Sequence, residues 1–157
     1  MIGYFDKGSP VFIQKRVGKN KKPFALIKFR TMSVDTKSVA SHLASTASIT
    51  RLGGFLRKTK IDEQPQLINV LKGEMSLVGP RPCLFNQEEL IEAREALDVF
   101  DVLPGITGLA QINDIDMSTP ILLADWDQRM IRGFSFSTYV KYILLTVTGK
   151  GSGDRVK

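Results

Sequence analysis

Two short runs of strand-like residues near the N-terminus constrain the fold of this chain more than any other feature. Residues 11–17 and 24–30 have the length and the β-branched and aromatic content of strands. Residues 18–23 between them form a basic stretch that begins with Gly18 and ends with Pro23, as turns often do. The pattern therefore predicts a β-hairpin.

The rest of the chain consists of short segments that Gly and Pro interrupt, without the regular alternation of strand and helix that builds a doubly wound sheet. We expect helices at residues 51–58, 63–72, 86–97, 122–131 and 136–148, a strand at 76–78, a loop or weak helix at 33–50, an irregular segment at 103–112 and a flexible tail at 149–157. The expected fold class is mixed α/β of the α+β type. It is a single compact domain, residues 1–157, in which several short helices surround a small antiparallel hairpin.

Three of these helices carry local signals. In the helix at 63–72, the residues Leu67, Ile68 and Leu71 form the apolar face. The helix at 86–97 opens with what resembles a capping box, Asn86-Gln87-Glu88-Glu89. The helix at 136–148 is amphipathic, and its apolar face suits either the domain core, which we favour, or a membrane interface.

Charge and residue counts exclude several kinds of site. A net charge of +6 favours polyanionic partners, but it does not choose among nucleic acid, anionic lipid and phosphorylated small molecules. Cys83 and His42 are the only cysteine and histidine, so an internal disulfide and a Cys/His zinc site are excluded. A histidine-based triad would need His42, which lies in a small polar stretch that we interpret as an ordinary loop.

Membrane and export signals are weak in this sequence. No run of 18 apolar residues occurs, so we expect no membrane-spanning helix. Residues 1–7 lack the apolar core of a signal peptide. Nothing in the sequence therefore directs export.

The adjacent carboxylates Asp62 and Glu63 are the first candidate site. They stand at the predicted start of a helix, where Pro65 is tolerated and the helix dipole favours negative charge. Nearby cations, Arg57 among them, favour the ionised form of both carboxylates. An ionised Asp beside a second carboxylate that can bind Mg²⁺ suits phosphoryl chemistry, although Asp62 could equally serve only as a helix cap.

Two basic segments are further candidates. Gly79-Pro80-Arg81-Pro82 presents Arg81 from a turn that its prolines stiffen, and an Arg can hold a phosphate with two parallel hydrogen bonds. Lys28 and Arg30 end the second predicted strand and could line the same anionic pocket. The alternatives are a solvated surface turn for Arg81 and an ordinary half-buried strand for Lys28 and Arg30.

In this order, the segments resemble the bacterial sugar transferase family, whose members are monotopic polyprenyl-phosphate sugar-1-phosphate transferases. The resemblance covers nearly the whole chain and is carried by residues 8–12, 14, 16–18, 28–32, 61–67, 69–82 and 104–111. It implies a sugar transferase catalytic domain at the cytoplasmic face of the bacterial inner membrane. The expected product initiates a surface glycan such as lipopolysaccharide or capsule.

The resemblance also implies a mechanism and a set of site residues. Asp62 would attack the sugar-bearing phosphate of a UDP-sugar, release UMP and form a phosphosugar-aspartate that passes to a polyprenyl phosphate. Glu63 would hold the Mg²⁺ cofactor against the diphosphate. The residues expected to bind substrate are Lys28, Arg30, Arg57, Gln66, Arg81 and Asp127.

The sequence departs from the family pattern at three places. Family members carry an apolar re-entrant helix before the segment at 8–12, and here only seven residues precede Gly8. After Gln111 the family often continues Val-Asn-Gly-Arg, and residues 112–115 of this chain lack the Arg. Asp127 matches a recurrent family Asp, but the aromatic positions after it are Met130 and Ile131.

Two rival functions follow from these observations. The missing re-entrant helix motivates an inactive fragment or scaffold that binds a transferase partner or the membrane without turnover. The positive charge motivates a nucleic-acid-binding module. Because no recognisable reading motif and no stacking platform of aromatic residues occurs, we expect no nucleic-acid partner.

Overall fold

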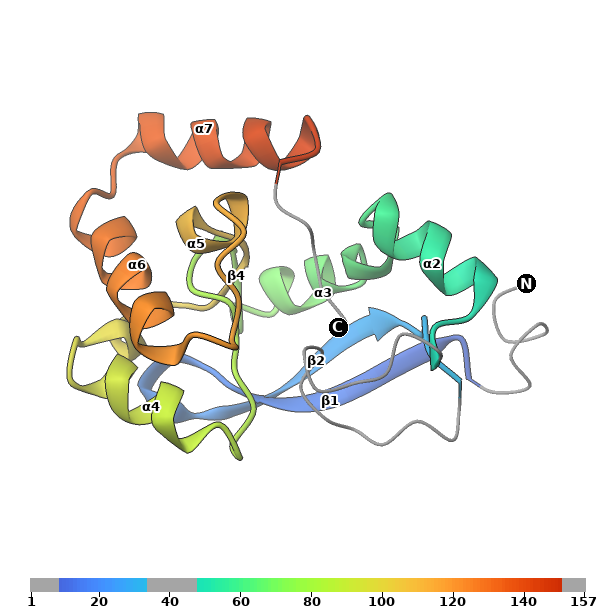
Figure 1. Cartoon of the computed structure of the whole chain (residues 1–157), viewed down its shortest axis with the longest axis horizontal. Helices are drawn as coiled ribbons and strands as arrows, with labels where there is room; N and C mark the ends of the chain where they lie inside the picture. Colours follow the sequence, from blue (N-terminus) through green and yellow to red (C-terminus); the bar gives the residue numbers. More distant parts are fainter. Residues whose placement is uncertain (1–8, 34–47, 151–157) are drawn as a thin grey trace.

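The computed structural model describes residues 9–33 and 48–150. The predicted hairpin is confirmed: β1 (Val11–Val17) pairs antiparallel with β2 (Pro23–Phe29), with Val11 opposite Phe29 and Val17 opposite Pro23. The short 3-10 turn η1 (Lys19–Lys21) connects the two strands. The hairpin forms one long edge of the domain (Figure 1). His42, most of the segment at 33–50 and residues 151–157 of the tail lie outside the described residues.

A second, parallel sheet lies deeper in the domain. It pairs β3 (Ser76–Val78) with β4 (Gly105–Thr107). The sequence predicted β3 but showed β4 only as part of an irregular segment. A Cβ on Gly105 would lie 2.0 Å from the main-chain nitrogen of Gly79, so the two segments approach more closely than any residue with a side chain permits. Glycine at both positions therefore serves close packing of the backbone.

The expected helices are present with shifted ends. They are α2 (Arg51–Lys58), α3 (Gln66–Leu71), α4 (Glu88–Glu95), α6 (Pro120–Arg132) and α7 (Phe136–Val147). The short helix α5 (Leu109–Ile112) was not predicted and lies in the segment expected to be irregular; short 3-10 turns occur at η4 (Ile61–Glu63) and η5 (Val99–Asp101). The capping box at Asn86 was wrong. The N-cap of α4 is Gln87, whose side chain accepts a hydrogen bond from the main-chain N–H of Leu84 (2.9 Å) instead of capping the helix.

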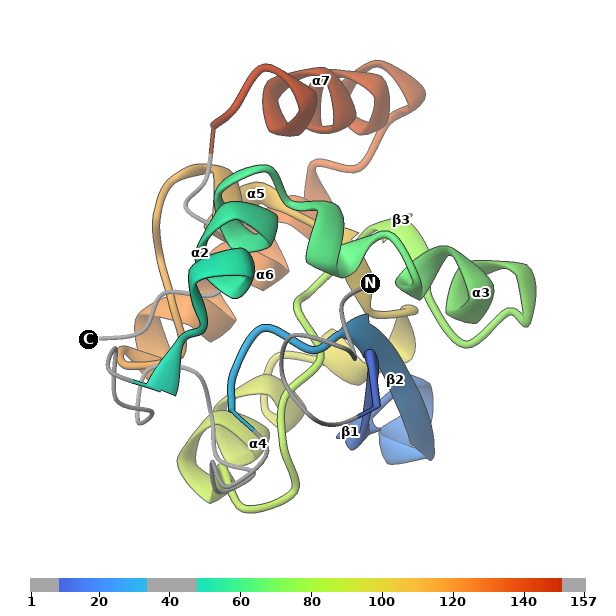
Figure 2. The same ribbon diagram turned by 90° about the vertical axis from the view of Figure 1, so that its right-hand side faces the viewer.

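Three apolar clusters hold these elements together. One joins the end of β1 to α4, α5 and α6, and includes the buried Cys83 and Leu123. A second packs the inner face of β2 against Met75, and a third packs β3 and α6 against Tyr142 of α7. Helix α7 lies along the edge opposite the hairpin, and Figure 2 shows α2 and α3 between these two edges.

Helix α3 is oriented opposite to its expected amphipathicity. Leu67, Ile68 and Leu71 share a face as predicted, but they are 43%, 46% and 89% exposed. The buried residues are Gln66 and Asn69. Asn69 donates to the main-chain oxygen of Ala25 (2.8 Å) and accepts from the N–H of Ile27 (3.2 Å). The buried amide is therefore satisfied by β2, and this docking turns the apolar face outward.

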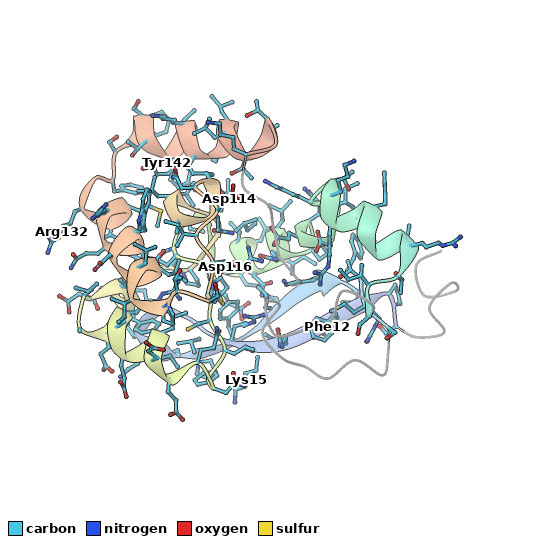
Figure 3. The ribbon with its side chains drawn as sticks, viewed as in Figure 1. Phe12, Lys15, Asp114, Asp116, Arg132 and Tyr142 are labelled. Atoms are coloured by element: carbon cyan, nitrogen blue, oxygen red, sulfur yellow. The ribbon has the colours of Figure 1, made fainter. Side chains whose placement is uncertain are left out.

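Helix α7 has apolar residues on both faces. Tyr139, Tyr142 and Ile143 pack against the core, and Tyr142 points into the domain (Figure 3). The outward-facing residues are Phe136, Val140, Leu144 and Val147, which are 83%, 37%, 59% and 79% exposed. The expected core packing thus accounts for one face only. Within residues 9–33 and 48–150, no helix is both long and apolar enough to cross a membrane.

Candidate active site

The two candidate carboxylates lie in a tight turn just before a helix. Asp62 and Glu63 belong to η4, and α3 begins only at Gln66. The shift from the predicted helix start has a local cause, because Lys60 adopts a left-handed conformation (φ 57°) that separates η4 from α2. Asp62 is 4% exposed and Glu63 is 7% exposed. Two adjacent carboxylates this deeply buried need charged or hydrogen-bonding partners.

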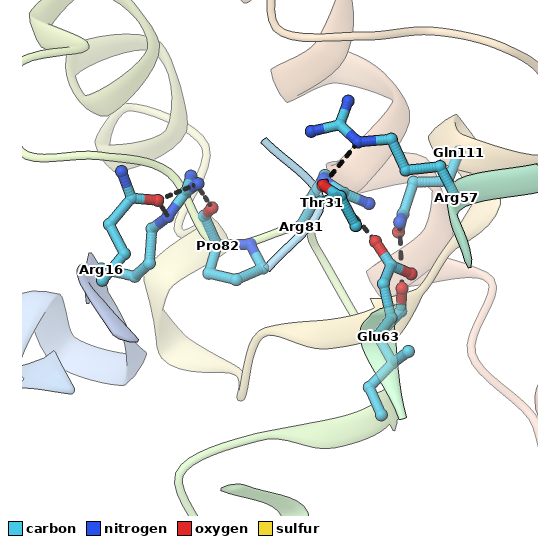
Figure 4. A network of polar contacts seen from close by, with 9 residues as sticks. Arg16, Thr31, Arg57, Glu63, Arg81, Pro82 and Gln111 are labelled. Carbon is cyan, nitrogen blue, oxygen red and sulfur yellow. Dashed lines mark hydrogen bonds and ion pairs between the residues drawn. The ribbon is translucent and has the colours of Figure 1, made fainter. Parts of the chain in front are cut away.

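Arg81 is such a partner for Glu63. Its Nη2 donates to Glu63 Oε1 at 2.8 Å, and the two side chains are 16% and 8% exposed (Figure 4). Arg81 follows β3, whereas Glu63 precedes α3. The ion pair therefore joins the two segments that the sequence singled out independently.

The loop that presents Arg81 is fixed at every carbonyl from residue 80 to residue 83. Gly105 N–H donates to the oxygen of Pro80, and Val17 N–H donates to the oxygen of Cys83, both at 2.9 Å. The two carbonyls between them accept from buried guanidinium groups: that of Arg81 from Arg94 (2.8 Å) and that of Pro82 from Arg16 (3.0 Å). Arg81 thus projects from a backbone with little freedom to move.

Arg94 is a buried residue that the sequence did not reveal as important. It is 1% exposed, and its Nε and Nη2 donate to Asp127 Oδ2 at 2.9 and 2.7 Å. Burial alone would lower the pKa of Arg94, but the Asp127 carboxylate outweighs this effect and raises it. The guanidinium therefore remains charged. Arg94 lies four residues after the buried Leu90, so a charge on the inner face of the predicted helix was the available signal.

Asp127 was expected to bind substrate, and in the structure it is paired with Arg94. It is 2% exposed, and its carboxylate is occupied by Arg94. Because removing either partner would leave an uncompensated buried charge, this geometry favours a supporting role over direct contact with a ligand.

A small basic cavity brings three of the predicted residues together. Lys28, Gln66 and Arg81 line it, together with Arg16. Lys28 is 7% and Gln66 is 3% exposed. At about 10 Å³, the cavity holds no more than about one water molecule. The cluster is thus a source of positive charge beneath the surface.

Arg16 and the two remaining predicted residues have separate surroundings. Arg16, which the sequence did not reveal, is held by Gln14 Oε1 at 3.0 and 2.6 Å. Arg57 Nε donates to Thr31 Oγ1 (2.8 Å) just beyond the end of β2, as Figure 4 shows. Arg30 turns toward the start of β1, where its Nε donates to the oxygen of Ser9 (2.8 Å). Neither Arg30 nor Arg57 lines the basic cavity.

A larger and mostly apolar groove opens on another side of Glu63. Its volume is about 180 Å³, and its apolar walls are Leu67, Leu77, Ile106, Ile143 and Val147. Lys60 also lines it, and its Nζ lies 2.7 Å from the main-chain oxygen of Lys150. Partial burial lowers the pKa of Lys60, while the charge of Glu63 opposes this effect.

The donor set limits how a metal could bind. Among residues 9–33 and 48–150, no group of three or more His, Cys, Asp or Glu side chains could hold a metal ion. Mg²⁺ commonly uses one or two protein carboxylates and takes its other oxygens from substrate phosphates and water. Asp62 and Glu63 could supply these one or two carboxylates. They could not by themselves form a site in which every ligand comes from the protein.

Comparison with known proteins gives consistent results. The family model for bacterial sugar transferases matches residues 1–150. An uncharacterized sugar transferase of Haemophilus influenzae is 41% identical over 142 residues, covering 77% of this chain and 30% of that protein. An uncharacterized sugar transferase of Bacillus subtilis is 43% identical over 141 residues, covering 89% and 69%. The UDP-glucose:undecaprenyl-phosphate glucose-1-phosphate transferase of Klebsiella pneumoniae is 40% identical over 152 residues, covering 90% and 32%. The chain thus spans about a third of the length of two of these relatives.

Proposed function

Since this chain belongs to the bacterial sugar transferase family, we propose that it transfers a sugar-1-phosphate from a UDP-sugar to a polyprenyl phosphate. The observation that carries the proposal is the buried pair of carboxylates, Asp62 and Glu63, with Arg81 fixed on Glu63 at 2.8 Å. The name of the Klebsiella relative, which specifies UDP-glucose and undecaprenyl phosphate, supports the two substrate classes.

In the proposed first step, an Asp62 carboxylate oxygen forms a bond to the phosphorus that carries the sugar. The bond from that phosphorus to the bridging oxygen breaks, and UMP leaves with the electron pair. In the second step, a phosphate oxygen of the polyprenyl phosphate attacks the same phosphorus and returns the Asp62 carboxylate. Covalent catalysis thus divides one difficult transfer into two simpler substitutions.

The surrounding charges suit this chemistry. The cations of Lys28 and Arg81 would offset the negative charge of the diphosphate, with Arg57 and Gln66 close to the same turn. Mg²⁺, when bound by Glu63 and substrate oxygens, would supply further charge stabilisation. If Glu63 held Mg²⁺, it would share or exchange its contact with Arg81, and the Arg81 guanidinium could then hold a phosphate oxygen.

We further propose that Asp127 acts through Arg94 rather than on the substrate. The carboxylate holds Arg94, and Arg94 holds the carbonyl of Arg81. Arg30, which contacts Ser9 and the ring of Phe12, is proposed to order the start of β1 near the site.

Membrane contact is part of the proposal, because the acceptor is a lipid. The outward apolar face of α7, formed by Phe136, Val140 and Leu144, would lie at the interface, and the net positive charge would favour anionic headgroups. This arrangement corresponds to a peripheral or monotopic enzyme at the cytoplasmic face of the bacterial inner membrane. The proposed product would initiate a surface glycan such as lipopolysaccharide or capsule.

The proposal is tested by an assay of sugar-1-phosphate transfer to the lipid. Purified protein is incubated with Mg²⁺, a panel of UDP-sugars and undecaprenyl phosphate in detergent, and UMP and the extracted lipid are measured. The proposal predicts one UMP released for each lipid-linked sugar diphosphate, with neither product formed by Asp62→Asn. Absence of both products with every sugar, from folded protein, would favour a scaffold that does not turn over.

A further inference from the structure

The groove beside Glu63 differs in character from the basic cavity. The basic cavity is lined by Lys28, Arg81 and polar side chains, whereas most of the groove is aliphatic. It lies between α3, the parallel sheet and α7, which passes over β4 (Figure 1). A basic cluster beneath the surface and an apolar groove therefore lie on different sides of the Glu63–Arg81 pair.

The two threonine hydroxyls in the groove wall already have partners. The hydroxyls of Thr107 and Thr146 lie 2.5 Å apart, and Thr146 Oγ1 also donates to the oxygen of Tyr142 at 2.9 Å. A polar ligand placed against this wall would lose its hydrogen bonds to water without replacement, which is costly. A hydrocarbon would meet no such penalty and would gain from burial.

One end of the groove carries a positive charge. Lys60 Nζ contacts the main-chain oxygens of Thr146 (3.5 Å) and Lys150 (2.7 Å), and within the described part of the chain it has no carboxylate at ion-pair distance. Its charge is therefore available to an anion. An ammonium group at one end of an apolar groove complements an anionic head joined to a hydrocarbon chain.

We propose that this groove binds the acceptor lipid, with the hydrocarbon nearest the phosphate lying along Leu67, Leu77, Ile143 and Val147 and the phosphate beside Lys60. The inference rests on the proposed function, because it assigns the second substrate to a place in the same site. It also explains how a UDP-sugar and a polyprenyl phosphate could both reach Asp62 and Glu63. The nucleotide uses the polar side, and the lipid phosphate arrives from the apolar side at Glu63.

The first test compares two leucines of α3. Leu67 lines the groove, whereas Leu71, one turn later, is 89% exposed and does not line it. With farnesyl phosphate as acceptor in detergent, Leu67→Asp should raise the KM for the acceptor about tenfold or more, since a charge replaces an apolar wall. Leu71→Asp should leave that KM unchanged. Equal effects of the two substitutions would overturn the assignment.

The second test removes the charge without straining the backbone. Lys60 has a left-handed conformation, which Asn tolerates better than most residues, so Lys60→Asn is the suitable variant. It should raise the KM for the acceptor while the mass of the covalent adduct formed from UDP-sugar alone still appears. Lys60→Arg should restore most of the acceptor affinity. If Lys60→Asn and Lys60→Arg both leave the acceptor KM at the wild-type value, Lys60 does not bind the lipid phosphate.

A third measurement needs no turnover and separates this inference from the proposed function. A prenyl phosphate that carries a photoreactive diazirine on its hydrocarbon is irradiated with the full chain, and the labelled peptides are mapped. The groove predicts labels at Leu77 or Ile143 that excess undecaprenyl phosphate removes. Labels confined to Phe136 and Leu144 on the outer face would contradict it. Failure of the proposed function would instead appear as no adduct and no transfer, whatever the labelling pattern.

Discussion

The buried guanidinium of Arg94 donates a hydrogen bond of 2.8 Å to the main-chain carbonyl of Arg81, the residue whose side chain holds Glu63. The same guanidinium is anchored by Asp127. A continuous set of contacts therefore runs from α6 through α4 to Glu63, which adjoins Asp62, and the inner members of this set have almost no contact with solvent.

Breaking this buried pair should destabilise the protein strongly. Asp127→Asn removes the charge that compensates Arg94, and we expect a loss of about 3–5 kcal/mol in the free energy of unfolding. The exposed pair of Lys21 and Glu95 provides the control: Glu95→Gln should cost no more than about 1 kcal/mol. Urea denaturation of the two variants measures both values, and similar losses would contradict the special role of the buried pair.

Arg81 should matter for activity beyond any effect of its loss on folding. Its side chain is 16% exposed, and in the proposed reaction Arg81→Met removes a cation from the place where diphosphate charge develops. We expect kcat/KM for the UDP-sugar to fall about 100-fold. The measurement is steady-state kinetics on variants whose melting temperature is checked first. A fall of less than about threefold would exclude Arg81 from the binding of the diphosphate, because loss of even one such contact costs more.

Two adjacent glycines in α2 should respond in opposite directions to alanine. A Cβ on Gly53 would lie 2.0 Å from the main-chain oxygen of Thr31, whereas a Cβ on Gly54 meets nothing within 4 Å. Gly54→Ala should stabilise the protein by about 0.5–1 kcal/mol through helix propensity. Gly53→Ala should destabilise it by about 1–3 kcal/mol, because backbone must shift. Thermal denaturation of the two variants directly checks how closely α2 packs against the backbone of Thr31.

Cys83 should behave as an inert thiol in the native protein. It is 0% exposed, and burial raises its pKa above the ordinary value of 9.0, although the charge of Arg94 opposes the rise. A thiol-specific reagent at pH 8 should therefore react only after unfolding. Fast labelling of native protein would show that the loop at residues 79–83 opens readily.

The same thiol gives a pH dependence with a definite sign. Because the folded-state pKa is raised, the contribution of Cys83 to stability is complete below pH 9.0 and is lost as the pH rises through the folded-state pKa. Cys83→Ala should remove this part of the alkaline destabilisation. If Cys83→Ala lost as much stability between neutral and alkaline pH as the wild type does, the raised pKa of Cys83 would be contradicted.

Much of the fold was predictable because its signals are local. The hairpin follows from two runs of strand-forming residues around a Gly- and Pro-bounded turn, and α2, α6 and α7 follow from periodicity. The strand β4 was not predictable in this way, because its three residues, Gly105–Thr107, pair only with the distant β3. Such pairing depends on the close approach of Gly79 and Gly105, which no local pattern encodes.

Periodicity identified which residues share a face of a helix or strand. It did not show which face is buried where the buried face is the polar one. In α3, Gln66 and Asn69 are inside and Leu71 is outside. In β1, Arg16 is buried while Ile13 is 62% exposed. In both elements the buried polar residues belong to hydrogen-bonded networks, which make the burial of polar groups favourable. The same networks explain why Lys28, Gln66 and Arg81 gather as predicted, while Asp127 is turned toward Arg94.

The measurement that tests the central claim most directly is the intact mass of the protein after incubation with Mg²⁺ and a UDP-sugar, without lipid. We predict a mass gain equal to one sugar phosphate, which appears as UMP is released. This adduct should be absent in Asp62→Asn and should be discharged when polyprenyl phosphate is added. Product formation with no adduct at any time, or an adduct that persists in Asp62→Asn, would contradict the role assigned to Asp62.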